Sequence, residues 1–125
     1  MMYACFILMV LSYYLTNSYV FPLFDYPKLK HTLFFTCILT LTFFITSAIR
    51  DPGYVKKEEA QPFIKLVELF DPSCLCPECE VIKNPRSRHC NVCDKCVDRF
   101  DHHCPWIDNC VGKRNHGFFY GYLIF

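Results

Sequence analysis

The fold of this chain is decided by residues 76–110, which read CPECEVIKNPRSRHCNVCDKCVDRFDHHCPWIDNC. Cysteines recur here at spacings typical of metal ligands, because two ligands separated by two residues close a tight loop around one ion. This spacing occurs in Cys76-x2-Cys79 and twice in Cys90-x2-Cys93-x2-Cys96. Hydrophobic residues are sparse in this stretch, so we expect bound metal, rather than an apolar core, to hold short β-hairpins and loops together.

A tetrad after these pairs places a thiol beside two imidazoles and a carboxylate, and its residues are Asp101, His102, His103 and Cys104. From Cys74 to Cys110 the chain contains eight cysteines and three histidines, whereas two closed tetrahedral sites use eight ligands. Three groups are therefore left over. Spacing alone leaves the division open, because two all-cysteine sites are arithmetically possible and Cys104 suits either a ligand or a free nucleophile.

Cysteine usage and charge also restrict the class of protein. Eight of the ten cysteines lie between Cys74 and Cys110, and in a reducing compartment such density indicates metal binding rather than disulfides. The net charge is +1 and no block of like charges is present, so no nucleic-acid partner is expected. No sequence repeat, low-complexity stretch or glycine-rich phosphate loop is evident.

Apolar residues make up 53% of the chain and gather in blocks, unlike the alternation of a soluble core. Residues 1–24 and 32–49 are each long enough for a helix to cross a hydrocarbon layer of about 30 Å. We predict transmembrane helices over both ranges, joined by a short lumenal turn at 25–31. A signal peptide is the alternative for the first block, but no basic start or cleavage pattern accompanies it. A buried core helix is the alternative for the second, but the rest of the chain is too polar to cover it.

Basic residues indicate the orientation of these helices. Lys28 and Lys30 lie in the predicted turn. A larger set of basic residues lies near the two ends of residues 50–115, namely Arg50, Lys56, Lys57, Lys113 and Arg114. This excess favours a cytosolic position for residues 50–115. Residues 116–125 turn apolar again, and we expect them to begin a third transmembrane helix that is truncated. The predicted fold class is an α-helical polytopic membrane protein with a small, zinc-stabilised cytosolic cysteine-rich domain at about residues 74–115.

This pattern resembles the cysteine-rich domain of the DHHC protein S-acyltransferases, or palmitoyltransferases. Further motifs on both sides of the tetrad carry the resemblance, namely Asp51-Pro52-Gly53 after the second apolar block, Pro105-Trp106, and Asn115-x3-Phe119. The resemblance implies one zinc ion bound by Cys76, Cys79, His89 and Cys96. It implies a second zinc ion bound by Cys90, Cys93, His103 and Cys110. Cys74, His102 and Cys104 then remain outside the metal sites.

The same resemblance implies the reaction. Cys104 would take a long-chain acyl group from acyl-coenzyme A and pass it to a cysteine of a cytosolic or membrane-associated substrate protein. His102 would supply the thiolate, and Asp101 would orient the imidazole, as in a Cys-His-Asp triad. The phosphates of the co-substrate need cationic groups, and we predict that Lys83, Arg86 and Arg88 provide them. The implied location is the Golgi, the endoplasmic reticulum or the plasma membrane.

Two features leave a second class of function open. Members of the family resemble four-span proteins with a Thr-Thr-x-Glu motif after the last span, and this sequence ends within the third. The alternative is therefore a catalytically inactive, membrane-tethered zinc-binding fragment or scaffold. A ring-type ubiquitin ligase is disfavoured because its pattern closes on a Cys-x2-Cys pair, whereas the last two ligands expected here are His103 and Cys110.

Overall fold

The computed structural model describes residues 2–23, 27–57 and 62–125. The helices are α1 (Met2–Leu15), continued by a π-helix (Thr16–Val20) and a 3-10 turn (Phe21–Leu23), α2 (Pro27–Ile49), α3 (Phe63–Leu69), a second 3-10 turn (Pro72–Cys74) and α4 (His116–Ile124). The strands are β1 (Leu75–Cys76), β2 (Val81–Ile82), β3 (Arg88–Cys90), β4 (Lys95–Val97), β5 (His102–Cys104) and β6 (Asn109–Val111).

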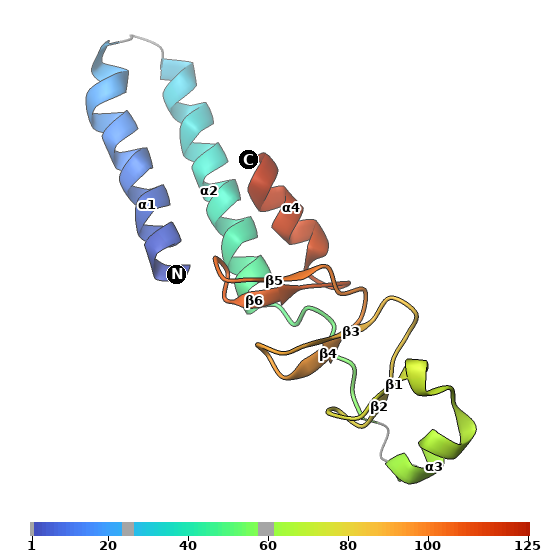
Figure 1. The fold of residues 1–125 in the computed structure, drawn as a ribbon. Coiled ribbons are helices and arrows are strands. Elements are labelled where there is room, and N and C mark those ends of the chain that lie inside the picture. The colour runs from blue at the N-terminus through green and yellow to red at the C-terminus, as the bar shows by residue number, and fades with distance from the viewer. Residues whose placement is uncertain (1, 24–26, 58–61) are drawn as a thin grey trace.

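The N-terminal third of the chain is a helical hairpin (Figure 1). Its two helical segments, Met2–Leu23 and Lys28–Ile49, are 22 residues each, long and apolar enough to cross a membrane. The second helix begins at Pro27, so residues 27–31 of the predicted turn are helical instead. Proline suits the first position of a helix, because its fixed φ is helical and no N–H is needed there. The remainder of the predicted turn, Asp25 and Tyr26, lies outside the described residues.

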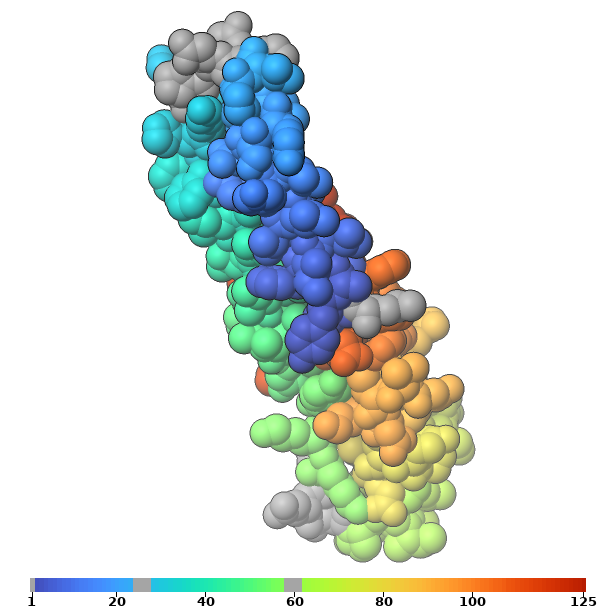
Figure 2. All heavy atoms as spheres, turned by 90° about the vertical axis from the view of Figure 1, so that its left-hand side faces the viewer, coloured from blue at the N-terminus to red at the C-terminus, as the bar shows by residue number. Residues whose placement is uncertain are grey.

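Helix α4 covers residues 116–124 of the segment predicted to begin a third span, and it packs along the second half of α2. Aromatic rings fill this interface: the Phe43 ring lies 5.9 Å from that of Phe125, and the Phe44 ring 5.2 Å from that of Tyr122. Gly121 permits the close approach, since a Cβ there would come within 3.0 Å of the Phe43 ring. The space-filling view shows that the helices and the cysteine-rich segment together form one narrow body (Figure 2).

The cysteine-rich segment consists of three two-stranded antiparallel hairpins in sequence order, β1–β2, β3–β4 and β5–β6. In all three, the last residue of the first strand pairs with the residue five positions later: Cys76 with Val81, Cys90 with Lys95, and Cys104 with Asn109. The residue that ends each turn has a left-handed backbone, with φ of 53° at Glu80, 52° at Asp94 and 51° at Asp108. The hairpins share one backbone design.

This regularity corrects the expectation that the sequence contains no repeat. Cys76, Cys90 and Cys104 recur every 14 residues, and so do the turn-ending residues Glu80, Asp94 and Asp108. The second and third copies match most closely, reading HCNVCDKCV from His89 and HCPWIDNCV from His103. The repeat is short and its first copy has diverged, so the spacing of the ligands alone does not reveal it.

Two buried asparagines attach the third hairpin to the end of α2. The Asn109 side-chain amide donates to the carbonyls of Ser47, Ala48 and Arg50 at 2.9–3.3 Å. The fully buried Asn115 amide donates to the carbonyls of Ser47, at 3.1 Å, and Cys110, at 2.8 Å. The last carbonyls of a helix have no partner within the helix. These side chains supply partners, and thereby fix β5–β6 to the predicted membrane helix.

The Asp51-Pro52-Gly53 motif turns the chain at the same place. The Asp51 carboxylate accepts hydrogen bonds from the backbone N–H groups of Gly53 and Tyr54 at 2.8 and 2.9 Å, and it pairs with Arg114 at 3.0 Å. Partial burial raises the pKa of Asp51, but these donors and the Arg114 charge outweigh it and leave the pKa below its ordinary value. Gly53 has a φ of 108°, which L side chains rarely adopt.

Replacing Asn115 with leucine should destabilise the protein strongly. The substitution keeps the number of heavy atoms and the branched shape but leaves the Ser47 and Cys110 carbonyls and the Gly112 N–H without their side-chain partner. Each buried group left unsatisfied costs about 1–3 kcal/mol. Thermal unfolding in detergent measures the loss, and Asn91→Leu, at an exposed turn position, is the control. Equal melting temperatures for the two variants would show that Asn115 does not support the attachment.

Candidate functional site

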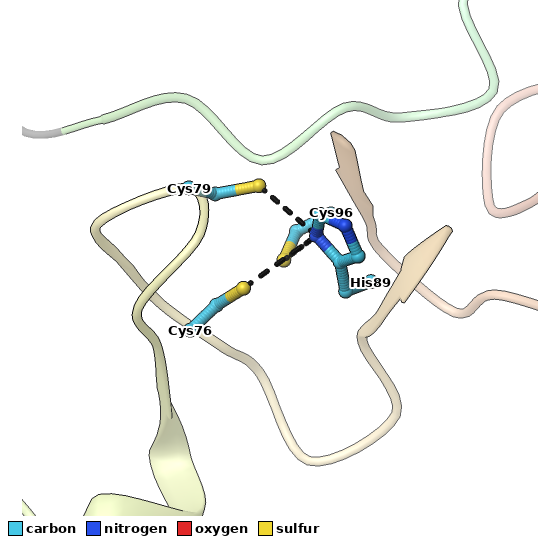
Figure 3. A group of neighbouring side chains, drawn as sticks. All are labelled: Cys76, Cys79, His89 and Cys96. Atoms are coloured by element: carbon cyan, nitrogen blue, oxygen red, sulfur yellow. Dashed lines mark hydrogen bonds between the residues drawn. The ribbon is translucent and has the colours of Figure 1, made fainter. Parts of the chain in front are cut away.

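The first group of metal-ligating side chains lies between the first and second hairpins (Figure 3). The ligand atoms of its four residues all lie within 4.8 Å of one another, and the residues are Cys76, Cys79, His89 and Cys96. The two sulfurs of the Cys76-x2-Cys79 pair lie 3.6 and 3.3 Å from Nδ1 of His89. Nδ1 therefore faces the centre of the group, and the four residues suit one tetrahedral ion.

The second group has the same composition and lies between the second and third hairpins. Its residues are Cys90, Cys93, His103 and Cys110. Nδ1 of His103 lies 3.3 Å from the Cys93 sulfur and 3.7 Å from the Cys110 sulfur. The structure thus brings together both sets of four residues that the family resemblance implied, and either set could hold a metal ion.

The hairpin repeat explains why the ligands interleave along the sequence. Directly opposed residues on antiparallel strands carry side chains on one face. His89 is opposite Cys96 in β3–β4, and His103 is opposite Cys110 in β5–β6. Each group therefore combines a Cys-x2-Cys pair at the turn of one hairpin with a His–Cys pair across the strands of the next. One ion would join two neighbouring hairpins.

The electrostatics of these groups favour a bound cation. Burial raises the pKa of the Cys96 and Cys110 thiols, and the neighbouring cysteine side chains raise it further. Without a cation, several thiolates cannot coexist at such distances in a buried site. A divalent ion such as zinc stabilises the thiolates and is itself the largest charge in the site.

Cys104 belongs to neither group. Side chains alternate between the faces of a strand, so in β5 His102 and Cys104 share one face and the metal-ligating His103 occupies the other. Cys104 is 4% exposed and packs in an apolar cluster with Phe44, Ile107, Val111 and Phe119. Met2, Cys5 and Met9 of α1 pack against the same cluster. The thiol thus lies where the ends of the helices meet the third hairpin.

A carboxylate and two imidazoles lie beside this strand. Oδ2 of Asp101 is 3.4 Å from Nδ1 of His102 and 3.9 Å from Nε2 of His116. A carboxylate only accepts hydrogen bonds, so the neutral His102 tautomer favoured here carries its proton on Nδ1. Its Nε2 is then left with a free lone pair, which is the arrangement required of a general base.

Asp101 is also one of the residues that line an open cavity of about 560 Å³. Its walls carry four basic side chains, those of Arg86, Arg88, Arg99 and Lys113, together with His116. Of the three residues predicted to meet phosphates, Arg86 and Arg88 line this cavity, whereas Lys83 is not among its lining residues. Arg99, Lys113 and His116 escaped prediction because the cavity is lined by three separate segments, at residues 85–88, 99–101 and 112–116, and no local spacing marks it.

Purified protein should contain two metal ions per chain, and single ligand substitutions should lower that number. Cys79→Ser removes one thiolate from the first group, and Cys93→Ser one from the second, so each should bind about one ion fewer. Elemental analysis by mass spectrometry gives the content. Cys74→Ser, at an exposed cysteine outside both groups, should retain both ions. A full complement in either ligand variant would refute the assignment of that group.

Comparison with known proteins identifies the cysteine-rich segment. Residues 69–125 match the sequence model described as DHHC palmitoyltransferase. The chain is 37% identical to palmitoyltransferase Hip14 of Drosophila melanogaster over 87 residues, covering 64% of this chain and 14% of that protein. It is 34% identical to palmitoyltransferase ZDHHC4 of Bos taurus over 91 residues, covering 70% of this chain and 26% of the relative.

A third relative is the human palmitoyltransferase ZDHHC17, which is 49% identical over 80 residues, or 60% of this chain and 13% of that protein. The aligned part of the chain therefore spans between 13% and 26% of the length of these three relatives. Within that part, the family match begins before the first metal-ligating cysteine and includes all of the tetrad. By this match, the chain belongs to the DHHC palmitoyltransferase family.

Proposed function

We propose that this chain forms part of a protein S-acyltransferase that transfers a long-chain acyl group from acyl-coenzyme A through Cys104 to a cysteine of another protein. One observation carries the proposal: Cys104 lies outside both groups of metal-ligating residues, on the strand face that also carries His102. A thiol outside the metal groups, two residues along the same strand face from a carboxylate-oriented imidazole, suits an activated nucleophile.

The membrane shelters the acyl chain in this proposal. Segments Met2–Leu23 and Lys28–Ile49 cross the bilayer, and the cysteine-rich segment lies on the cytosolic side. The thiol then sits at the membrane boundary, because Cys104 packs beside residues of α1, α2 and α4. An acyl chain attached to Cys104 can remain among the apolar helices, where its methylene groups stay out of water.

The first step loads the enzyme. His102 takes the Cys104 thiol proton on Nε2, and the thiolate attacks the carbonyl carbon of the acyl-coenzyme A thioester. The bond to the coenzyme A sulfur then breaks, and the His102 imidazolium returns the proton to that departing thiolate. Asp101 stabilises the imidazolium during the exchange, since its carboxylate already faces Nδ1 at 3.4 Å.

The second step transfers the group. The thiol of a substrate cysteine gives its proton to His102 and attacks the acyl carbon on Cys104. The Cys104 sulfur leaves and regains a proton from the imidazolium, so free enzyme is restored. One thioester replaces another in each step, and therefore the protein contributes positioning and thiolate supply rather than a driving force.

The two metal ions act structurally in this mechanism, and zinc fits both donor sets, each of three cysteines and one histidine. The second ion would bind His103, the neighbour of both His102 and Cys104 in β5. Holding His103 fixes the strand, and the strand fixes the direction of the two side chains on its opposite face. The ion thus orders the reacting groups without taking part in bond making.

Cys104→Ser should abolish labelling by a clickable palmitoyl-coenzyme A analogue while retaining two zinc ions per chain. The serine oxygen is a far poorer nucleophile than a thiolate at neutral pH, and Cys104 belongs to neither ligand group. The label on the unsubstituted protein should be released by hydroxylamine, as expected of a thioester. Cys74→Ser is the matched control and should label normally. Zinc-loaded, unsubstituted protein that takes up no label would instead favour a non-catalytic scaffold.

The basic cavity beside Asp101 is the place we propose for the phosphates of coenzyme A. Replacing both Arg86 and Arg88 with alanine should raise the KM for acyl-coenzyme A by about tenfold or more, because hydrogen bonds to charged groups contribute about 1.5–3 kcal/mol. The Lys83→Ala variant removes a nearby positive charge that does not line the cavity. Steady-state kinetics should show a larger rise in KM for the Arg86/Arg88 variant than for Lys83→Ala. An equal rise in KM for the two variants would mean that the cavity has no special role.

A further inference from the structure

The third hairpin has the backbone of a metal-binding hairpin but no metal group. Cys104 occupies the position that Cys76 holds in the first hairpin and Cys90 in the second, with the same pairing five residues later. Both of those equivalent residues belong to ligand groups. Within the described residues, no ligand group includes Cys104. The candidate nucleophile therefore stands in a ligand position of the repeat.

Two differences separate the third hairpin from the others. The second cysteine of the pair, Cys79 in the first copy and Cys93 in the second, is replaced by Ile107. In addition, within the described residues helix α4 follows the third hairpin, whereas each of the first two is followed by a hairpin with a His–Cys pair. Ile107 is only 1% exposed and shares the apolar cluster of Cys104. An apolar side chain thus fills the place where a second sulfur would lie.

We propose that the lack of a second metal ligand at position 107, where Ile107 replaces the cysteine of the other hairpins, keeps the Cys104 thiol free of metal and so available for acylation. The reason is chemical: one thiolate lone pair serves either as a nucleophile or as a metal ligand. A Cys-x2-Cys pair in this turn would chelate a soft cation, whereas a single thiolate in an apolar cluster does not hold one. The consequence for acylation rests on the proposed function, whereas the expected effect of position 107 on metal binding does not.

The geometry for chelation is already present in the hairpin. The turn from Cys104 to Asn109 has the same length and pairing as the turns that place Cys76 with Cys79 and Cys90 with Cys93. It also ends on the same left-handed residue, with φ of 51° at Asp108 against 52° at Asp94. A cysteine at position 107 would therefore direct its sulfur as the cysteines at 79 and 93 do.

The test is a metal count on Ile107→Cys. Purified variants are equilibrated with Cd²⁺, a thiolate-seeking cation, and total bound Zn²⁺ plus Cd²⁺ is measured, because Cd²⁺ also exchanges into zinc sites. The expected totals are three ions for Ile107→Cys and two for the unsubstituted protein and for Ile107→Ala. The double variant Ile107→Cys/Cys104→Ser should return to two. Ile107→His offers a different ligand at the same position, should the cysteine variant lose its structural ions.

Acylation provides the second measurement. Cd²⁺ should abolish palmitoyl labelling of Ile107→Cys at concentrations that leave the unsubstituted protein active, and EDTA at levels that spare the two structural ions should restore it. A total of two ions for both the cysteine and histidine variants would overturn the proposal. If the unsubstituted protein takes up no acyl label, the proposed function fails, and the ion totals alone still decide whether position 107 controls metal binding at Cys104.

Discussion

The grouping of four possible metal ligands between successive hairpins is the constraint on which the cysteine-rich segment depends. Strands of two or three residues bury too little apolar surface to fold alone. Each four-ligand group spans two hairpins, so an ion fixes the position of one hairpin relative to the next. The hairpin β3–β4 contributes to both groups, its strands to the first and its turn to the second. If both groups bind an ion, folding and metal loading of this segment are one process.

The sequence allowed much of this arrangement to be predicted, for identifiable reasons. Apolar length indicated the two long helices, and cysteine spacing indicated short hairpins held by metal. The division of ligands into two groups required the family resemblance, because spacing alone left Cys90, Cys93 and Cys96 free to pair in more than one way. The structure places the first two in one group and the third in the other.

What escaped prediction depends on cross-strand pairing and on the packing of distant segments. The 14-residue repeat is visible only once the register is known, since Cys79 and Cys93 correspond to an isoleucine in the third copy. His116 has no sequence spacing that marks it, yet its ring nitrogen comes within 3.9 Å of the Asp101 carboxylate. Helix α2 was also predicted to begin too late, because it extends back to Pro27 through a segment that contains the polar residues Lys28, Lys30 and His31. Polarity marks the end of an apolar block more reliably than the end of a helix.

The order of the three hairpins also determines how motion reaches the thiol. In a row of linked bodies, displacement relative to a fixed support grows with each link. The support is the end of α2, where Asn109 and Asn115 donate to its carbonyls, and β5–β6 is the hairpin attached to it. The hairpin β1–β2 lies two links further away (Figure 1). The thiol is thus on the hairpin attached directly to α2, and the first hairpin lies furthest from that attachment.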